Sequence, residues 1–203
     1  MEAARNNIRN AGLTRQIELR LGEGLTKLKY GQVATVVIAG MGGRTIARIL
    51  ESAKNRETEP GAVFGPDQGP LRIVMQAQTD LEYLRRTIVT LGLTLTDEGL
   101  VLDRGRFYPI LIANGLNTYA QDIDQLRQKN IPSDSEWNEF DWKWGPILRR
   151  SGQALYRSWL LHSRETVVER LKGPPQGKAR SQSLERQWKH QILEFGAELD
   201  RIS

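Results

Sequence analysis

The chain has 203 residues, a net charge of +5 and no cysteine. This length suffices for one α/β domain with an appended segment, and the lack of cysteine excludes a disulfide framework and a thiolate metal site. Because only two histidines occur and no apolar run reaches about 18 residues, we expect no metal site and no membrane span. The positive charge is concentrated in residues 143–189, where eleven Lys and Arg accompany three Glu. Such a block suits a polyanionic partner or a solvated helix face.

The first 30 residues predict three short elements. Residues 2–11 predict a helix, with Gly12 as its C-terminal cap. Apolar and polar residues alternate over residues 17–21, which is typical of a strand. A glycine-containing turn follows, and we expect a short helix after it that ends near residue 30.

Residues 36–50 form the element around which the first part of the chain is organised. Val36–Ala39 is an apolar, mostly β-branched run, which predicts a strand buried on both faces. Gly40, Gly42 and Gly43 follow, and apolar residues at helical spacing then predict a helix. Ligands bind at the carboxyl ends of strands in open α/β sheets, and glycine lets them approach the backbone. A plain turn, with glycines only for tightness, is the alternative.

Strands and helices alternate beyond this element. Residues 57–70 are rich in Gly and Pro and predict a loop, and residues 71–75 predict a second buried strand. Asp80 is expected to cap a helix that ends near residue 91. Two strands, over residues 93–102 and 106–113, are joined by a turn with a glycine and predict a hairpin. The plan is an α/β sheet with a reversed final strand.

The composition changes after residue 114. The following stretch is polar and contains Trp137, Trp142 and Trp144, which could stack on bases but are better explained as the anchor of a link between domains. We expect a helix from Pro146 to about Leu171 and then a second helix with a heptad seam. The seam residues are Trp188, Ile192, Phe195, Leu199 and Ile202. Together they predict an antiparallel helical hairpin, in which His162 and His190 are surface or seam residues rather than catalysts.

Two kinds of ligand suit the glycine turn. A dinucleotide is one, because Gly40-Met41-Gly42-Gly43 is similar to a shortened G-x-G-x-x-G motif. However, Thr45 replaces the third glycine, and no strand ends in an acid about 20 residues later. S-adenosylmethionine is the other, because methyltransferase sheets close with an antiparallel hairpin. Glu23 could then accept a hydrogen bond from an adenine amino group.

Several strings in the chain resemble one family, the bacterial tRNA adenine-22 N1-methyltransferases. The resemblance rests on Leu21-Gly22-Glu23-Gly24-Leu25, on Val37-Ile38-Ala39-Gly40-Met41-Gly42-Gly43, on Met75-Gln76 with Ala77 in place of a proline, on Gly105-Arg106-Phe107-Tyr108 and on Gly145-Pro146-Ile147-Leu148. It implies a class I (Rossmann-like) methyltransferase sheet that lacks its first strands, plus a C-terminal α-helical hairpin. It also implies S-adenosylmethionine as cofactor, tRNA as substrate, a cytoplasmic location, and neither membrane nor metal.

The same resemblance suggests domain limits and site residues. Residues 1–116 would be a partial methyltransferase domain, 117–145 a linker and 146–203 a coiled-coil-like tail. The residues expected at the cofactor are Glu23, Gly24, Ala39, Gly40 and Met41. Those expected at the substrate base are Gly42, Gly43 and Gln76. In the tail, Arg150, Arg157, Arg164 and, roughly, Arg170 recur at steps of seven and predict a basic stripe on the RNA. The residues expected to contact the RNA are Arg149, Arg150, Arg157, Arg164 and Lys172.

The chain departs from the family at its start. The family begins with a strand, a glycine loop and a second strand that ends in an acid for the ribose, and these would precede Met1. We therefore expect an N-terminally truncated chain that binds S-adenosylmethionine weakly or not at all. The Val36 strand should have an exposed edge, where the strand over residues 17–21 moves in to pair, a gap remains, or a partner chain associates, self-association included. Two functions stay open, an impaired tRNA (adenine-N1)-methyltransferase and a non-catalytic RNA-binding or partner-binding remnant. An NAD(P)-binding protein is a third alternative.

Overall fold

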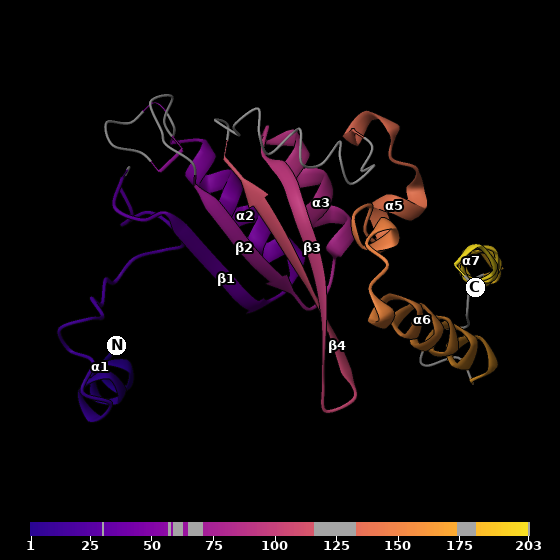
Figure 1. The fold of residues 1–203 in the computed structure, drawn as a ribbon, viewed down its shortest axis with the longest axis horizontal. Coiled ribbons are helices and arrows are strands. Elements are labelled where there is room, and N and C mark those ends of the chain that lie inside the picture. The colour runs from indigo at the N-terminus through magenta and orange to yellow at the C-terminus, as the bar shows by residue number, and fades with distance from the viewer. Residues whose placement is uncertain are drawn as a thin grey trace.

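A four-stranded sheet lies at the centre of the computed structural model (Figure 1). The structure describes residues 1–29, 31–56, 58, 63–64, 71–115, 133–173 and 182–202. Helix α1 (Glu2–Asn10) lies beyond one edge of the sheet, and the C-terminal helices lie beyond the opposite edge. Most of the predicted loop over residues 57–70, and much of the predicted linker over 117–145, fall outside the described residues.

The sheet has the strand order β1-β2-β4-β3. Strands β1 (Thr35–Met41) and β2 (Arg72–Ala77) are parallel, and β4 (Arg106–Asn114) is antiparallel to both β2 and β3 (Thr94–Asp103). Antiparallel pairing follows from the two-residue turn between β3 and β4, since so short a connection cannot cross over the sheet. The predicted α/β sheet with a reversed final strand is thereby confirmed.

Helices α2 (Gly43–Lys54) and α3 (Leu81–Thr90) cover one face of the sheet (Figure 1). Their apolar residues recur at helical spacing and meet the inward-facing residues of the strands. The fully buried members of this first core are Ile46, Ala47, Leu50, Ile73, Met75, Ala77, Leu84, Ile88, Leu111 and Ala113. This core fixes the positions of the two turns that follow β1 and β2.

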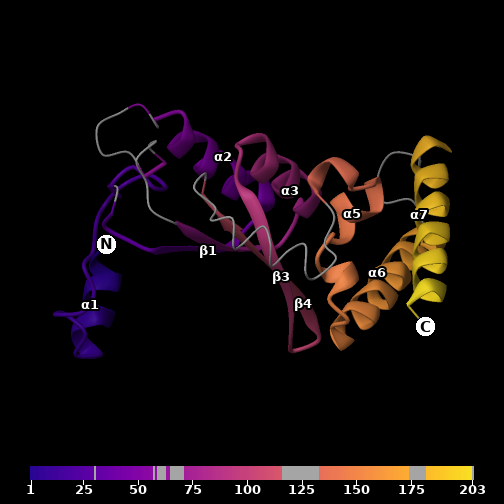
Figure 2. The same cartoon turned by 45° about the horizontal axis from the view of Figure 1, so that its top comes forward.

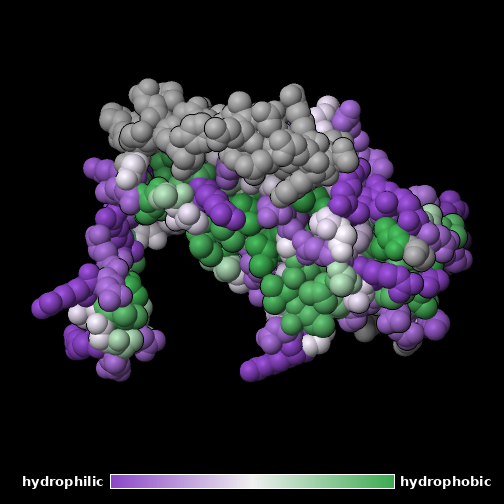
Figure 3. All heavy atoms as spheres, viewed as in Figure 1, coloured by the Kyte–Doolittle hydropathy of each residue, from purple (hydrophilic) through white to green (hydrophobic). Residues whose placement is uncertain are grey.

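The other face of β1 is open, so the prediction of a strand buried on both faces is wrong. Val36 and Ile38 are buried, whereas Val37 between them is 68% exposed. Figure 3 shows hydrophobic residues gathered on this open face, over the strands of the sheet. Within the described residues β1 pairs only with β2, so its other edge is free, as the sequence predicts.

The segment before β1 differs from its prediction. Helix α1 forms as expected, but none of its residues is buried. Residues 17–21 are irregular rather than a strand, with Ile17 43% and Leu21 73% exposed. The segment that follows makes turns rather than the expected short helix. The alternation over residues 17–21 suits a strand, but a strand also needs hydrogen-bonding partners, and β1 does not pair with this segment.

The C-terminal part builds a second core from short helices and a helix pair. It contains η1 (Asp134–Glu136), α5 (Glu139–Trp144), η2 (Leu148–Arg150), α6 (Ala154–Lys172) and α7 (Gln182–Arg201). The predicted helix from Pro146 therefore begins later, after a turn in which Gly152 has φ +66°. Figure 2 shows α7 crossing α6, and the described helices include none that is long and apolar enough to span a bilayer.

The predicted seam on α7 is confirmed as its packing face. Phe195 is fully buried and Leu199 is 7% exposed, and the other three seam residues pack against the same core. Trp144 of α5 enters this core too, with ring centroids 5.2 Å from Trp159 and 4.6 Å from Phe195. His162 and His190 are exposed, as expected of surface residues.

A buried ion pair connects the sheet to the C-terminal part. Arg85 of α3 donates from Nε to Glu98 of β3 at 2.8 Å, and both side chains are 0% exposed. Arg85 also donates to the carbonyl oxygens of Trp142 and Lys143, and Glu98 accepts from the backbone N–H groups of residues 147 and 148. One pair of charges therefore binds two elements of the sheet domain to the turn between α5 and η2.

Candidate functional site at the glycine turn

The turns after β1 and β2 meet at the carboxyl edge of the sheet. A bulge at Gly40 shifts the register between Ala39 and Met41, and Gly40 has φ +77°. A Cβ at Gly40 would have no atom within 4 Å, so this glycine is needed for its backbone conformation and not for packing. The open space above it is where a ligand could reach the backbone.

Gln76 of β2 lies beside this turn. Its Oε1 atom accepts a hydrogen bond of 3.0 Å from the backbone N–H of Gly40. Its Nε2 atom is buried and has no hydrogen-bond partner within the described residues. A buried amide N–H₂ without an acceptor is costly, and a ligand with an acceptor atom would satisfy it. The sequence places Ala39, Met41 and Gln76 at a site, and the fold brings the three together.

Gly43 lies where the two turns touch. Its backbone N–H donates to the carbonyl oxygen of Thr79 at 2.8 Å, and a Cβ there would lie 2.4 Å from the carbonyl oxygen of Asp80. At Gly42 a Cβ would lie 3.0 Å from Thr79 Oγ1. These two glycines therefore allow the turn after β2 to pack directly on the start of α2.

Asp80 and its neighbours belong to the site, although the sequence points to Asp80 only as a helix cap. Asp80 does occupy the N-cap position of α3, but its side chain makes no cap hydrogen bond. Its carboxylate instead accepts from Arg44 Nε at 3.2 Å and from Thr79 Oγ1 at 2.8 Å. Arg44 also lies over the ring of Tyr83, 4.5 Å from its centroid. Asp80 has φ 54°, an uncommon conformation for a residue with a side chain.

The segment of Glu23 and Gly24 contacts α2 at a point farther along the helix than Gly43. A Cβ at Gly24 would lie 3.1 Å from a side-chain carbon of Ile49, and Leu25 is buried in the first core. Ile49 is six residues beyond Gly43 in α2, which is about 9 Å of helix rise. Glu23 itself is exposed. These two residues therefore lie beside α2, while the other expected cofactor residues lie at the end of β1.

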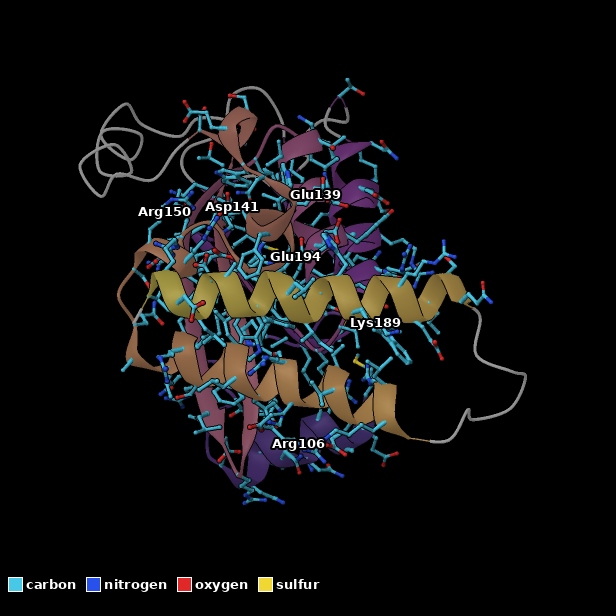
Figure 4. The ribbon with its side chains drawn as sticks, turned by 90° about the vertical axis from the view of Figure 1, so that its right-hand side faces the viewer. Arg106, Glu139, Asp141, Arg150, Lys189 and Glu194 are labelled. Atoms are coloured by element: carbon cyan, nitrogen blue, oxygen red, sulfur yellow. The ribbon has the colours of Figure 1, made fainter. Side chains whose placement is uncertain are left out.

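Arg149 and Arg150 are held by carboxylates in the C-terminal part. Arg149 contacts Glu198 at 2.7 Å and Asp141 at 3.2 Å, and Arg150 contacts Asp141 at 2.9 Å. Arg201 also pairs with Glu198. Figure 4 shows Arg150 beside Asp141 above α7. Because Arg150 belongs to η2 and not to α6, it does not continue a stripe with the arginines of α6.

The ion pairs favour the charged form of the two acids of this cluster. Burial raises the pKa of Asp141, but hydrogen bonds from Arg150 and from Asn138 N–H outweigh it, so the pKa lies below its usual value. Burial likewise raises the pKa of Glu198, and hydrogen bonds from Arg201 and Arg149 more than offset it. The cluster is thus a structural connection between α5, η2 and α7.

Three of the residues expected to contact the RNA are exposed on α6. Arg157 and Arg164 lie on its surface, and Lys172 is exposed in its last turn, where it pairs with Glu169 at 3.3 Å. Of the five residues expected to contact the RNA, these three can offer charge to solvent.

A parallel strand pair with a glycine turn at its carboxyl edge, closed by an antiparallel hairpin, defines a Rossmann-like fold of the class I methyltransferase type. Comparison with known proteins agrees, because residues 1–111 match the methyltransferase domain family, and the chain belongs to that family. The tRNA (adenine(22)-N(1))-methyltransferase of Bacillus subtilis is 31% identical over 111 residues, which are 55% of this chain and 42% of that protein. The chain thus matches less than half the length of this curated relative.

Solved structures share the fold over nearly the whole chain. A candidate tRNA (m1A22) methyltransferase of Streptococcus pneumoniae, Sp1610, superposes with a TM-score of 0.71 at 23% identity, covering 98% of this chain and 76% of that one. TrmK of M. capricolum, solved with S-adenosyl-homocysteine, gives a TM-score of 0.66 at 19% identity, with 98% and 76% covered. The C-terminal helices are therefore part of the shared architecture.

Proposed function

We propose that this chain acts in the cytoplasm as an S-adenosylmethionine-dependent methyltransferase on adenine N1 of tRNA. The observation that carries the proposal is the glycine turn, with open space at Gly40 and, beside it, the Nε2 atom of Gln76, which has no hydrogen-bond partner among the described residues. Membership of the methyltransferase domain family and the similarity to the B. subtilis tRNA methyltransferase support it.

The residues expected at the site suit two ligands, the adenosine part of the cofactor and the adenine base of the substrate. In this proposal Glu23, Gly24, Ala39, Gly40 and Met41 contact the cofactor, and Gly42, Gly43 and Gln76 hold the substrate base. When bound, S-adenosylmethionine supplies a methyl group on a sulfonium, which the lone pair of neutral adenine N1 can attack. The chain's own task is to hold N1 in line and to exclude water, so no general base is required. Adenine inside a structured RNA would first have to leave its stack.

The tail contributes RNA contacts in the same proposal. Arg157 and Arg164 on α6, with Lys172 at its end, are exposed and can meet phosphates. Arg149 and Arg150 support the tail indirectly, through their pairs with Asp141 and Glu198. Phosphate contacts of this kind release counterions, so the affinity for tRNA should fall steeply with salt.

A transfer assay with labelled S-adenosylmethionine and bulk tRNA tests the activity. We expect label in 1-methyladenosine after nuclease digestion and chromatography. The Gln76→Ala variant should lose at least about tenfold in rate, because it removes the side chain that positions the turn and the base. Gln78→Ala is the matched control, since Gln78 is exposed two residues farther along and contacts Met41 only through its backbone N–H.

The second candidate function is RNA binding without catalysis. The open face and free edge of β1 favour it, because an incompletely enclosed site admits water and positions a cofactor poorly. Binding of tRNA with no methyl transfer, and no heat of S-adenosylmethionine binding in a calorimetric titration, would support this second function and contradict the first.

Self-association through the free edge of β1 is a further part of the proposal. Edge strands with apolar residues offer unpaired N–H and C=O groups to a second copy. Val37, 68% exposed in the middle of β1, would lie beside the side chains of such a second strand.

A further inference from the structure

The β3–β4 hairpin extends past the site that the glycine turn forms. The last pair between β2 and β4 is Gln76 with Ile110, whereas β3 and β4 continue to pair as far as Asp103 with Arg106. Four more residues of β4 therefore extend beyond this pair, which is about 13 Å at 3.3 Å per residue. Figure 1 shows this end of the hairpin projecting from the sheet.

The projecting end shares a face with Gln76. Ile110 lies opposite Gln76 and so points to the same side of the sheet, and Tyr108 and Arg106 follow on that side at the strand period of two. This is the side that α2 and α3 do not cover, because Met75 and Leu111, which alternate with these residues, lie in the first core. A ligand on the glycine turn and a ligand on the hairpin would meet on one surface.

The turn at the tip presents an arginine in an unfavourable conformation. Arg104 has φ 47° and Gly105 has φ 76°, as in the two-residue turns that favour Asn or Asp followed by Gly. An arginine at the first of these positions makes the turn less stable than Asn would. A costly conformation at an exposed tip suggests that the guanidinium there has a use.

The tip is positively charged and partly apolar. Arg104 and Arg106 are both exposed, and within the described residues neither lies in an ion pair with a carboxylate. Asp103, the last residue of β3 and the partner of Arg106, is the single acid at this end of the hairpin. Val101 and Leu102 beside it are 45% and 46% exposed. In Figure 4, Arg106 lies below α6, on the opposite side of the helix pair from Arg150 and Asp141.

We propose that this hairpin end binds the RNA backbone next to the adenine that is methylated, with Arg104 and Arg106 on phosphates. The proposal rests on the proposed function, which makes tRNA the substrate. Strands β1 and β4 are separated by two strand spacings, about 10 Å, so a nucleotide on the glycine turn would have its neighbours' phosphates near the hairpin. Exposed guanidinium groups at the end of a hairpin suit phosphates and carry little sequence information.

The test measures binding of bulk tRNA to the full chain over a salt series. The Arg104→Gln/Arg106→Gln double variant should bind about tenfold more weakly at 0.1 M salt, and its salt slope should fall by between one and two units. The Arg104→Lys/Arg106→Lys variant should keep most of the slope because it keeps the charge. Arg72→Gln is the matched control, since Arg72 is exposed at the opposite, amino edge of the same sheet.

Two results would overturn the proposal in distinguishable ways. If the wild-type chain binds tRNA and the double Gln variant keeps the same affinity and salt slope, the hairpin is not an RNA contact, and the proposed function is untouched. If the wild-type chain does not bind tRNA, the proposed function fails and the hairpin proposal fails with it. A change of salt slope in Arg72→Gln about half that of the double variant would also overturn the proposal, because the effect would then follow the number of charges removed and not their position.

Discussion

Gly43 is the residue at which the two turns of the site depend most directly on each other. The Gly43→Ala variant should lose about 1–3 kcal/mol in free energy of unfolding, because its Cβ would lie 2.4 Å from the carbonyl oxygen of Asp80. Urea unfolding measures this loss. Gly99→Ala is the control, because a Cβ at Gly99 meets no atom within 4 Å and its backbone conformation is an ordinary one. An equal cost in the two variants would show that packing of the turns is not the cause.

The two halves of the site differ in how far the sequence predicts them. The glycines at 40, 42 and 43 could be recognised, because positions where the backbone is closely approached require glycine, and glycine is visible in the sequence. The contact between Arg44 and Asp80 could not, because it joins residues that are 36 positions apart and depends on two turns packing together. A residue at an N-cap position that is already paired elsewhere looks the same in sequence as one that caps its helix.

The Arg85–Glu98 pair should be the most sensitive connection between elements. The Arg85→Met variant should lose about 3–5 kcal/mol, because it leaves the carboxylate of Glu98 buried with no opposite charge. The next residue provides the control. Arg86 pairs with Glu139, but the two side chains are 41% and 66% exposed, so Arg86→Met should cost no more than about 1 kcal/mol. Similar losses for both variants in urea unfolding would contradict this account.

The ion-pair cluster of Asp141 and Glu198 predicts how stability depends on pH. Both carboxyls have a pKa below their usual values in the folded chain, so at acid pH the unfolded chain binds more protons. Their stabilisation is complete above the unfolded pKa values of about 4, and it is lost as the pH falls through the folded ones. Unfolding free energy should therefore decrease between about pH 5 and pH 3.

The Asp141→Asn/Glu198→Gln double variant isolates this effect. Neither replaced side chain titrates, so the double variant should be less stable at pH 7 and should show a shallower decrease toward pH 3. A slope equal to that of the wild type would show that other carboxyls are responsible for the acid dependence.

The sequence pattern of a segment predicts its structure well where the segment that it packs against is its neighbour in the chain. The β3–β4 hairpin and the α7 seam were predictable, since each pairs with its neighbour in sequence. Residues 17–21 have the alternation of a strand, but whether they pair depends on an edge elsewhere in the sheet. The apolar run of β1 suggests burial on both sides, yet burial of Val37 requires a covering layer that a pattern within one strand cannot report.

At the scale of the whole molecule, the described residues form two cores, which are connected by the Arg85–Glu98 pair and by Leu81, which packs against both. The first core lies between the sheet and α2 and α3, and the second lies among α5, α6 and α7. Ile147 packs in the first core and Leu148 in the second, so η2 begins where the two meet. The tail is therefore held at a fixed position relative to the sheet, which a substrate spanning both would require.

The free edge of β1 determines how whole molecules should associate. We expect the chain to self-associate with rising concentration, because an apolar edge strand pairs readily with another copy. The Val37→Lys variant should shift the chain toward the monomer, since a lysine on the edge strand adds charge and opposes pairing with a second strand. Size-exclusion chromatography with light scattering over a concentration series measures the change.

Leu193→Lys separates this edge from exposed apolar surface in general. Leu193 lies on α7 and is 71% exposed, close to the 68% of Val37. Both variants therefore replace a similarly exposed apolar side chain with a charged one. If association is specific to β1, Leu193→Lys should behave as the wild type does. Equal effects of the two variants would mean that nonspecific hydrophobic contact drives association, and a wild-type chain that stays monomeric would contradict self-association altogether.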